Sequence, residues 1–231
     1  MSIHSDFSQP VRVHTQSQPW LPSPMPGVER RPLDRVGDEV ARATSIVRYA
    51  PESHFSPHVH HGGEEFLVLE GVFQDEEGDY PAGTYVRNPP GSSHRPGSAP
   101  GCVIFVKLWQ FDPDDQTPVR LSPDQISATH DPQRPGVSLQ PLFSGFGETV
   151  SLEHWQPGAD IDLALPGGGE LLVLAGDCEQ DGNPLGPHDW LRLPVAGRLQ
   201  AKAGPQGTSL WLKTGHLQAL DQQLQRLQAR L

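Results

Sequence analysis

The chain has 231 residues, enough for two domains, and its short runs of Val, Leu, Ile and Phe between 24 glycines and 25 prolines favour an all-β globular protein over a disordered one. Its formal net charge of -11 argues against a nucleic-acid partner, because a phosphate backbone would be repelled. No apolar run is long enough for a signal peptide or a membrane span, so we expect a cytoplasmic protein without membrane contact.

Residues 1–38 are rich in proline, which cannot donate a backbone hydrogen bond within a central strand. We therefore expect an extended arm that packs on a barrel surface, with Trp20 as its anchor. Residues 39–111 are predicted to form the first barrel. Its expected strands are 39–50, 65–73, 83–88 and 102–111, with turns at Glu77–Asp79 and Pro89–Gly91.

The second half of the chain repeats the first. The segment Glu65–Gly71 matches Glu170–Gly176, and Tyr85–Pro89 matches Trp190–Pro194, so that both matches have an offset of 105 residues. This duplication predicts a second barrel at 142–215, joined to the first by a linker at 112–141.

The tail at 216–231 has a different pattern. Its leucines recur at alternating spacings of three and four, which predicts an amphipathic helix; they are Leu217, Leu220, Leu224, Leu227 and Leu231. We expect this helix to cap the second barrel, and the alternative is a helix that forms a homodimer contact.

A dense group of metal-ligand side chains precedes the strand expected at 65–73. On an extended backbone alternate side chains share a face, so His58, His60 and Glu64 can point in one direction, and Gly62 and Gly63 let the chain bend around an ion. Imidazole and carboxylate groups suit first-row ions such as zinc, iron, manganese, nickel or copper. Three neutral ligands and one anionic ligand would leave coordination positions open.

Two spaced motifs give this group a family resemblance. The first reads HxH, three residues, E, six residues, G, and comprises His58, His60, Glu64 and Gly71. The second reads G, five residues, PxG, two residues, H, and comprises Gly83, Pro89, Gly91 and His94. Both motifs resemble those of the cupin superfamily, although Ser98 replaces the asparagine that closes the second. The resemblance implies a small double-stranded β-helix, or jelly-roll, barrel with His58, His60, Glu64 and His94 as metal ligands.

The second copy lacks these ligands. At the 105-residue offset the four positions hold Leu163, Leu165, Gly169 and Leu199. A barrel interior without a metal must be filled with apolar side chains, so we expect the second barrel to be metal-free. The predicted protein is therefore a pair of tandem cupin barrels with one metal site.

The longer run around the first motif, including the GGEE and LVLEG segments, resembles the cupin domain of ChrR-type anti-sigma factors. That resemblance implies zinc as the metal, with iron, manganese or nickel as alternatives. It also implies a sensory role in the transcriptional response to oxidative stress or a small ligand, with a sigma factor or a small molecule as partner. The zinc-binding helical domain of those proteins, which carries an HxxxCxxC motif, has no counterpart in these residues, so a sigma factor would need another surface.

Two further functions stay open. Related cupins with the same four ligands include iron dioxygenases that cleave diketones and acetophenones, and a third alternative is a metal that only stabilises the fold. The sequence leaves the catalytic residues unknown. Strand parity suggests that the pocket is lined by Phe66, Val68, Tyr85, Arg87 and Phe105.

Overall fold

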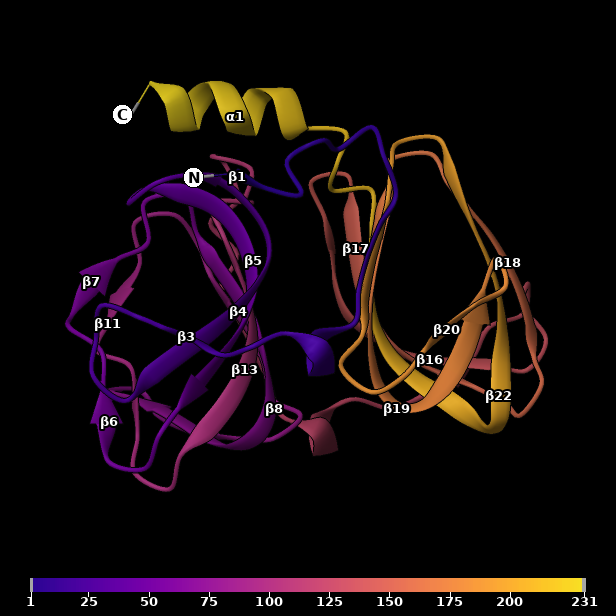
Figure 1. Ribbon diagram of the computed structural model, residues 1–231, viewed down its shortest axis with the longest axis horizontal. Coiled ribbons are helices and arrows are strands. Elements are labelled where there is room, and N and C mark those ends of the chain that lie inside the picture. The colour runs from indigo at the N-terminus through magenta and orange to yellow at the C-terminus, as the bar shows by residue number, and fades with distance from the viewer. Residues whose placement is uncertain (1, 230–231) are drawn as a thin grey trace. The chain divides into compact units, whose positions relative to one another are not determined.

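A computed structural model describes residues 2–229 and confirms the all-β prediction. Within these residues strands dominate, and one α-helix, α1 (Leu220–Gln228), lies near the end of the chain (Figure 1). The chain divides into two units. The first comprises residues 2–5, 19–125 and 221–229, and the second comprises residues 6–18 and 126–220. None of the described helices could span a membrane by its length and apolarity.

The first unit is an antiparallel barrel. Its main sheet has the strand order β1-β4-β5-β13-β8-β10-β14, and β7 pairs with β11 in a separate two-stranded sheet. The strands are β1 (Ser2–Ile3), β3 (Leu21–Pro22), β4 (Val28–Gly37), β5 (Ala41–Tyr49), β6 (Ser53–His54), β7 (His58–Val59), β8 (Glu64–Asp75), β9 (Gly78–Pro81), β10 (Tyr85–Asn88), β11 (Ser93–His94), β12 (Gly97–Ser98), β13 (Cys102–Leu108) and β14 (Val119–Leu121). A 3-10 turn at Pro123–Gln125 follows.

Alternate residues of the central strands fill this barrel. Phe66 and Val68 of β8 belong to one buried cluster with Ile104 and Val106 of β13, because side chains two residues apart share a face of the sheet. Tyr49 from β5 packs edge-on against Phe73 in the same cluster, with ring centroids 5.8 Å apart. The barrel interior is therefore apolar beside the predicted ligands.

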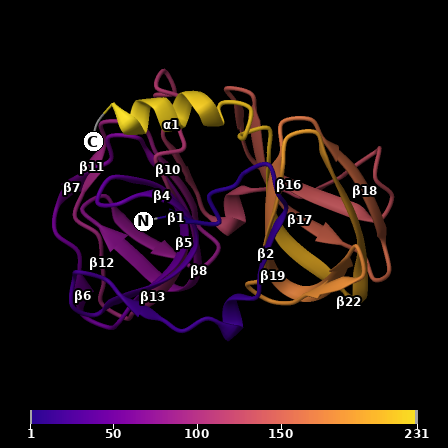
Figure 2. The same ribbon diagram turned by 45° about the horizontal axis from the view of Figure 1, so that its top comes forward.

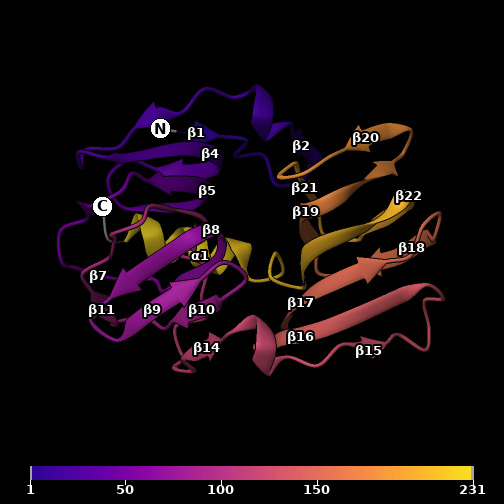
Figure 3. The same cartoon turned by 90° about the horizontal axis from the view of Figure 1, so that it is seen from below.

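The second unit is also antiparallel, with the strand order β15-β16-β17-β22-β19-β21-β2 (Figure 3). In addition, β18 pairs with β22 and β20 with β19. The strands are β2 (Val11–Val13), β15 (Thr129–His130), β16 (Val137–Gly145), β17 (Glu148–Trp155), β18 (Asp160–Leu165), β19 (Gly169–Gln180), β20 (Asn183–Leu185), β21 (Trp190–Leu193) and β22 (Gly197–Thr214). A 3-10 turn lies at Thr15–Ser17.

The two units repeat one another. Strand β8 begins at Glu64 and β19 at Gly169, and β10 begins at Tyr85 and β21 at Trp190, each at the offset of the duplicated sequence. Even an irregularity recurs, because the pairing of β4 with β5 shifts register after Pro32 and that of β16 with β17 shifts after Pro141. Proline lacks a backbone donor and is tolerated at such bulges.

The N-terminal residues differ from the predicted arm. Within 1–38 the structure contains β1, β2, β3 and the ten-residue β4, and Pro32 lies at the bulge of β4 rather than preventing the strand. Strand β2 belongs to the second unit, where it pairs with β21. Trp20 does lie against charged groups, with the guanidinium carbons of Arg31 and Arg48 at 4.2 and 4.4 Å from its ring centroid.

The predicted linker and tail also differ. Residues 112–141 contain β14, β15 and the start of β16, and the chain passes from the first unit to the second after Gln125. The helix begins at Leu220 rather than at His216 and packs on the first barrel, not on the second (Figure 2). Buried Gln223 accepts a hydrogen bond from Arg42 Nε and donates one to the Gln110 carbonyl. Leu231 lies outside the described residues.

Candidate metal centre

The four predicted ligands come from three neighbouring elements of the first barrel. His58 lies on β7 directly opposite His94 on β11, in an antiparallel pair. His60 follows β7, and Glu64 is the first residue of β8. Between them Gly63 has a φ of +78°, a conformation that most side chains disfavour, so the glycine allows the turn that brings Glu64 back towards the histidines.

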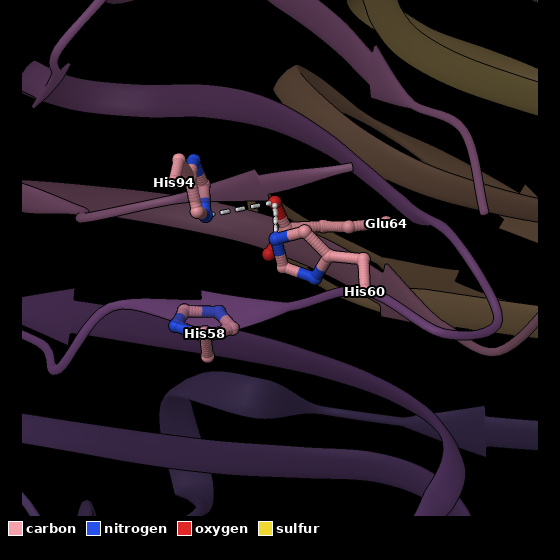
Figure 4. Close-up of side chains that lie close together, drawn as sticks. All are labelled: His58, His60, Glu64 and His94. Carbon is pink, nitrogen blue, oxygen red and sulfur yellow. Dashed lines mark ion pairs between the residues drawn. The ribbon is translucent and has the colours of Figure 1, made fainter. Parts of the chain in front are cut away.

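These side chains converge on one point (Figure 4). Each offers one ligand atom, and the four atoms lie within 4.8 Å of one another. Glu64 Oε2 is 3.3 Å from His60 Nε2 and 3.5 Å from His94 Nε2. A single ion can therefore contact all four groups, as three imidazoles and one carboxylate.

The hydrogen bonding of the cluster fits a metal. The Nε2 atoms of His60 and His94 are buried and have no hydrogen-bond partner among residues 2–229. Buried polar atoms normally have a partner, since leaving one unsatisfied costs about 1 to 3 kcal/mol. A divalent ion bound by these nitrogens and by Glu64 would satisfy both, so the residues present fit the metal that their arrangement implies.

Two of the imidazoles are oriented by acceptors behind them. Asp75 Oδ2 lies 3.2 Å from Nδ1 of His94, and the backbone carbonyl of Ser56 lies 2.8 Å from Nδ1 of His58. A carbonyl or carboxylate can only accept, so each Nδ1 carries the proton and each Nε2 presents its lone pair. Tyr80 donates to the other Asp75 oxygen at 3.1 Å and fixes that carboxylate in turn.

The ligand carboxylate is fixed in a similar way. Asn88 on β10 donates from Nδ2 to Glu64 Oε2 at 2.9 Å, and its own amide oxygen accepts a bond from Arg120 at 2.6 Å. Arg120 also contacts Glu77 at 3.1 Å. Hydrogen bonds to metal-binding groups hold them in the binding orientation, so Asn88 and Arg120 support the site without contacting the ion.

The surroundings shift the pKa values of His60 and His94 in opposite directions. Burial lowers the pKa of His60, which keeps this imidazole neutral and able to bind a cation. Burial acts in the same direction on His94, but the hydrogen bond with Asp75 and the charge of Glu64 outweigh it and raise the pKa of that imidazole. Of these two imidazoles, His94 is therefore the one at which a proton competes more strongly with a metal.

The four ligands differ in their exposure to solvent. His60, Glu64 and His94 are only 5%, 7% and 6% exposed, whereas His58 is half-buried and the adjacent Val59 is 46% exposed. Phe73 closes the inner side, with its ring centroid 5.9 Å from that of His94. His58 is therefore the most exposed of the four ligands, and an aromatic side chain lies beside His94.

The predicted pocket residues do not all lie together. Phe66 and Val68 line the barrel interior. Val86 lies opposite Phe66 and shares its face of the sheet, so its neighbours Tyr85 and Arg87 lie on the other face. Phe105 lies opposite Leu67, which is also on that other face. Their side chains make other contacts: Tyr85 donates to Glu65, Arg87 pairs with Asp115, and the Phe105 ring lies 6.0 Å from Lys107 Nζ.

The equivalent positions in the second barrel are packed. Leu163 lies directly opposite Leu199, as His58 lies opposite His94 in the first barrel. Leu165 and Leu199 are each 1% exposed within the core cluster, and Leu163 packs against it. A Cβ added to Gly169 would lie 3.0 Å from the Leu165 side chain, which fills the space of the missing carboxylate.

Three residues that support the site were not predicted from the sequence, namely Asp75, Asn88 and Arg120. Asp75 and Asn88 end their strands at β8 and β10, and Arg120 lies on β14 within the predicted linker. Parity gave no signal for Asp75, which lies an odd number of residues after Glu64 on a strand whose pairing with β13 shifts register, and Asn88 is placed only by its pairing with Glu64. Arg120 offered none, because its strand was not predicted.

Comparisons with known proteins agree with this architecture. Residues 8–112 match a family model described as the ChrR Cupin-like domain. The fold resembles a proposed dioxygenase from Nostoc punctiforme, with 15% identity, a TM-score of 0.72, and coverage of 90% of this chain and 82% of that one. No curated protein matches the chain at a significant level.

Two enzymes of solved structure share the fold. Oxalate decarboxylase from Lactobacillus farciminis aligns at 11% identity and a TM-score of 0.61, covering 88% of this chain and 85% of that one. Quercetin 2,3-dioxygenase from Acinetobacter baumannii aligns at 11% identity and a TM-score of 0.54, covering 81% and 78%. The chain therefore has the cupin fold, and its first barrel lies within the segment that matches the ChrR Cupin-like model and carries a three-histidine, one-glutamate cluster.

Proposed function

We propose that the first barrel binds one divalent first-row metal ion and acts as a mononuclear dioxygenase on a small diketone-like or acetophenone-like substrate. The observation that carries the proposal is the convergence on the Glu64 carboxylate of the His60 and His94 Nε2 atoms, which have no hydrogen-bond partner among residues 2–229. When bound, such an ion acts as a Lewis acid and, as iron, supports chemistry with dioxygen. A dioxygenase of this type places both oxygen atoms in the cleavage products and needs no separate reductant.

The protein's own groups support this chemistry in three ways. Asp75 and Asn88 hold His94 and Glu64 in position, which reduces the reorganisation needed when a ligand binds. Phe66 and Phe73 form an apolar wall that excludes water from the inner side. The half-buried His58 marks the side from which a neutral ketone can enter.

Oxygen consumption tests the proposal. Metal-depleted full-length protein would be loaded separately with iron(II) and zinc(II), and bound metal would be quantified before each assay. We expect iron-loaded protein to consume oxygen with pentane-2,4-dione or 4-hydroxyacetophenone, and zinc-loaded protein and His94→Ala to be inactive. Iron-loaded protein that holds a full equivalent of metal and consumes no oxygen with either class would contradict the proposal.

A second function is favoured by the family match at residues 8–112. In this alternative the same metal centre, loaded with zinc, senses an oxidant or a small ligand and changes the chain's affinity for a sigma factor. The test is capture of sigma factors by full-length zinc-loaded protein with and without peroxide, alongside stress transcription in a deletion strain. Peroxide-dependent capture would support the sensor, whereas no capture and unchanged transcription would exclude it.

A further inference from the structure

The second barrel contains a cavity of about 460 Å³. Its walls come from β16, β17, β18 and the end of β22, and include Phe143, Ser151, Leu163, Leu212 and Thr214. This volume falls within the roughly 300 to 1,000 Å³ of small-molecule sites. The cavity belongs to the unit that lacks the metal ligands, so the metal chemistry of the first barrel does not account for it.

Comparison of the two barrels explains why space exists here. Trp109 donates its backbone N–H to Gly63 O at 3.1 Å, and Gly215 donates to Gly168 O at 3.0 Å, so Trp109 and Gly215 occupy equivalent positions. In the first barrel the Trp109 ring covers Gly62, whose added Cβ would lie 2.3 Å from it. The second barrel has no side chain at this position.

The lining of the cavity confirms the correspondence. Gly215 and Gly167, the counterpart of Gly62, both line it. Leu163, at the position of ligand His58, also lines it, while Leu165 and Leu199 fill the core below. The glycine and leucine replacements thus leave a largely apolar opening where the first barrel has an indole ring and a metal ligand.

The polar groups of the lining indicate the charge of the occupant. Arg134 contacts both Glu153 oxygens at 2.9 and 2.7 Å and one Asp131 oxygen at 2.7 Å. Its single positive charge is therefore matched against two carboxylates, which disfavours an anionic ligand. The remaining polar lining is neutral, and includes the hydroxyl groups of Ser151 and Thr214.

We propose that the second barrel is a binding site for a neutral, mainly apolar small molecule of one or two rings that carries a single hydroxyl or keto group. The rings lie between Leu163 and Leu212, and the polar group meets the hydroxyl-bearing wall of β17 and β22. Binding is independent of the metal in the first barrel, because the two sets of lining residues share no member. This site goes beyond the proposed dioxygenase activity.

The test uses full-length metal-loaded protein at about pH 7 with 2-naphthol as the probe and 2-naphthoate as its anionic match. Isothermal titration calorimetry gives the dissociation constant, and methyl NMR of labelled leucines locates the probe. We expect 2-naphthol to bind at least ten times more tightly than 2-naphthoate and to shift the Leu163 and Leu212 methyl signals. His94→Ala should bind 2-naphthol as the parent does.

Variants that fill the cavity from two walls complete the test. Ser151→Phe from β17 and Leu163→Trp from β18 should each weaken 2-naphthol binding at least tenfold, while Ser138→Phe on β16, which does not line the cavity, should leave it unchanged. Circular dichroism identifies any variant that fails to fold, and the other then decides. Absent binding to the parent, unchanged binding in a folded filled variant, or equal binding of 2-naphthoate would overturn the proposal.

Discussion

Asp75 Oδ2 accepts a hydrogen bond from Nδ1 of His94 at 3.2 Å, so a residue at the end of β8 sets the tautomer of a ligand on β11. Carboxylate groups behind metal-binding histidines typically contribute about 10- to 100-fold to metal affinity. We therefore expect Asp75→Asn to weaken zinc affinity by about tenfold, measured by competition with a chelating dye. Asp79→Asn, an exposed carboxylate on β9, is the matched control, and equal affinities in both variants would contradict the assigned role.

Metal affinity should depend on pH through His94. Burial lowers the pKa of this imidazole, but the hydrogen bond with Asp75 and the nearby carboxylates outweigh it, so the net shift is upward from 6.5. Because the metal needs the deprotonated nitrogen, affinity should fall as pH drops through the raised pKa. In Asp75→Asn the midpoint of this loss should move to lower pH, as zinc titrations would reveal. A midpoint unaffected by the substitution would rule out His94 as the controlling group.

In the metal-depleted protein, the same upward shift in the pKa of His94 contributes stability at low pH rather than at high pH. A folded-state pKa above the unfolded value stabilises the fold below about pH 6.5, and this contribution is lost as pH rises through the folded pKa. Metal stabilises most where His94 is deprotonated. The increase in melting temperature on adding zinc should therefore be larger at about pH 8 than at about pH 5.5. A constant increase across this range would contradict the prediction.

The two equivalent positions His94 and Leu199 should respond differently to truncation. Leu199 is 1% exposed in the core, so Leu199→Ala should destabilise the second barrel by about 2 to 5 kcal/mol without changing metal content. His94→Ala should abolish metal binding. Chemical denaturation and elemental analysis of both variants check this pair of outcomes, and metal loss in Leu199→Ala would contradict the assignment.

Gln223 should anchor the C-terminal helix to the first barrel. Its side chain is 3% exposed and bonds to Arg42 Nε at 3.1 Å and to the Gln110 carbonyl at 2.9 Å. Gln223→Ala removes both hydrogen bonds and should cost about 1 to 3 kcal/mol in the free energy of unfolding. The exposed neighbour Gln222→Ala serves as the control, and equal unfolding free energies would show that the helix contributes little.

The four ligands could be predicted from the sequence because each has a fixed place in a short motif. His58, His60 and Glu64 follow strand parity and a glycine turn, and His94 lies opposite His58 after a predicted turn. The duplication placed β8 and β19 at matching starts. These features depend on local spacing, which a sequence displays directly.

Features that depend on contacts between distant segments were not predictable in this way. Nothing local to Val11–Val13 indicates pairing with β21, and the leucine pattern of α1 does not specify which barrel it covers. Strand β4 was not predicted because Pro32 lies within it, and only the pairing with β5 reveals the bulge. Tyr85 and Arg87 were assigned to the wrong face of β10, because that face depends on the register between β10 and β8.

Metal stoichiometry tests the central claim most directly, namely that one barrel of this duplicated chain holds a metal ion. Protein purified without added metal, then saturated with zinc and desalted, would be analysed for metal per chain by elemental mass spectrometry. The arrangement of His58, His60, Glu64 and His94 predicts one ion per chain in the parent and none in His94→Ala. Two tightly held ions in the parent, or a full equivalent retained by a folded His94→Ala variant, would contradict the account.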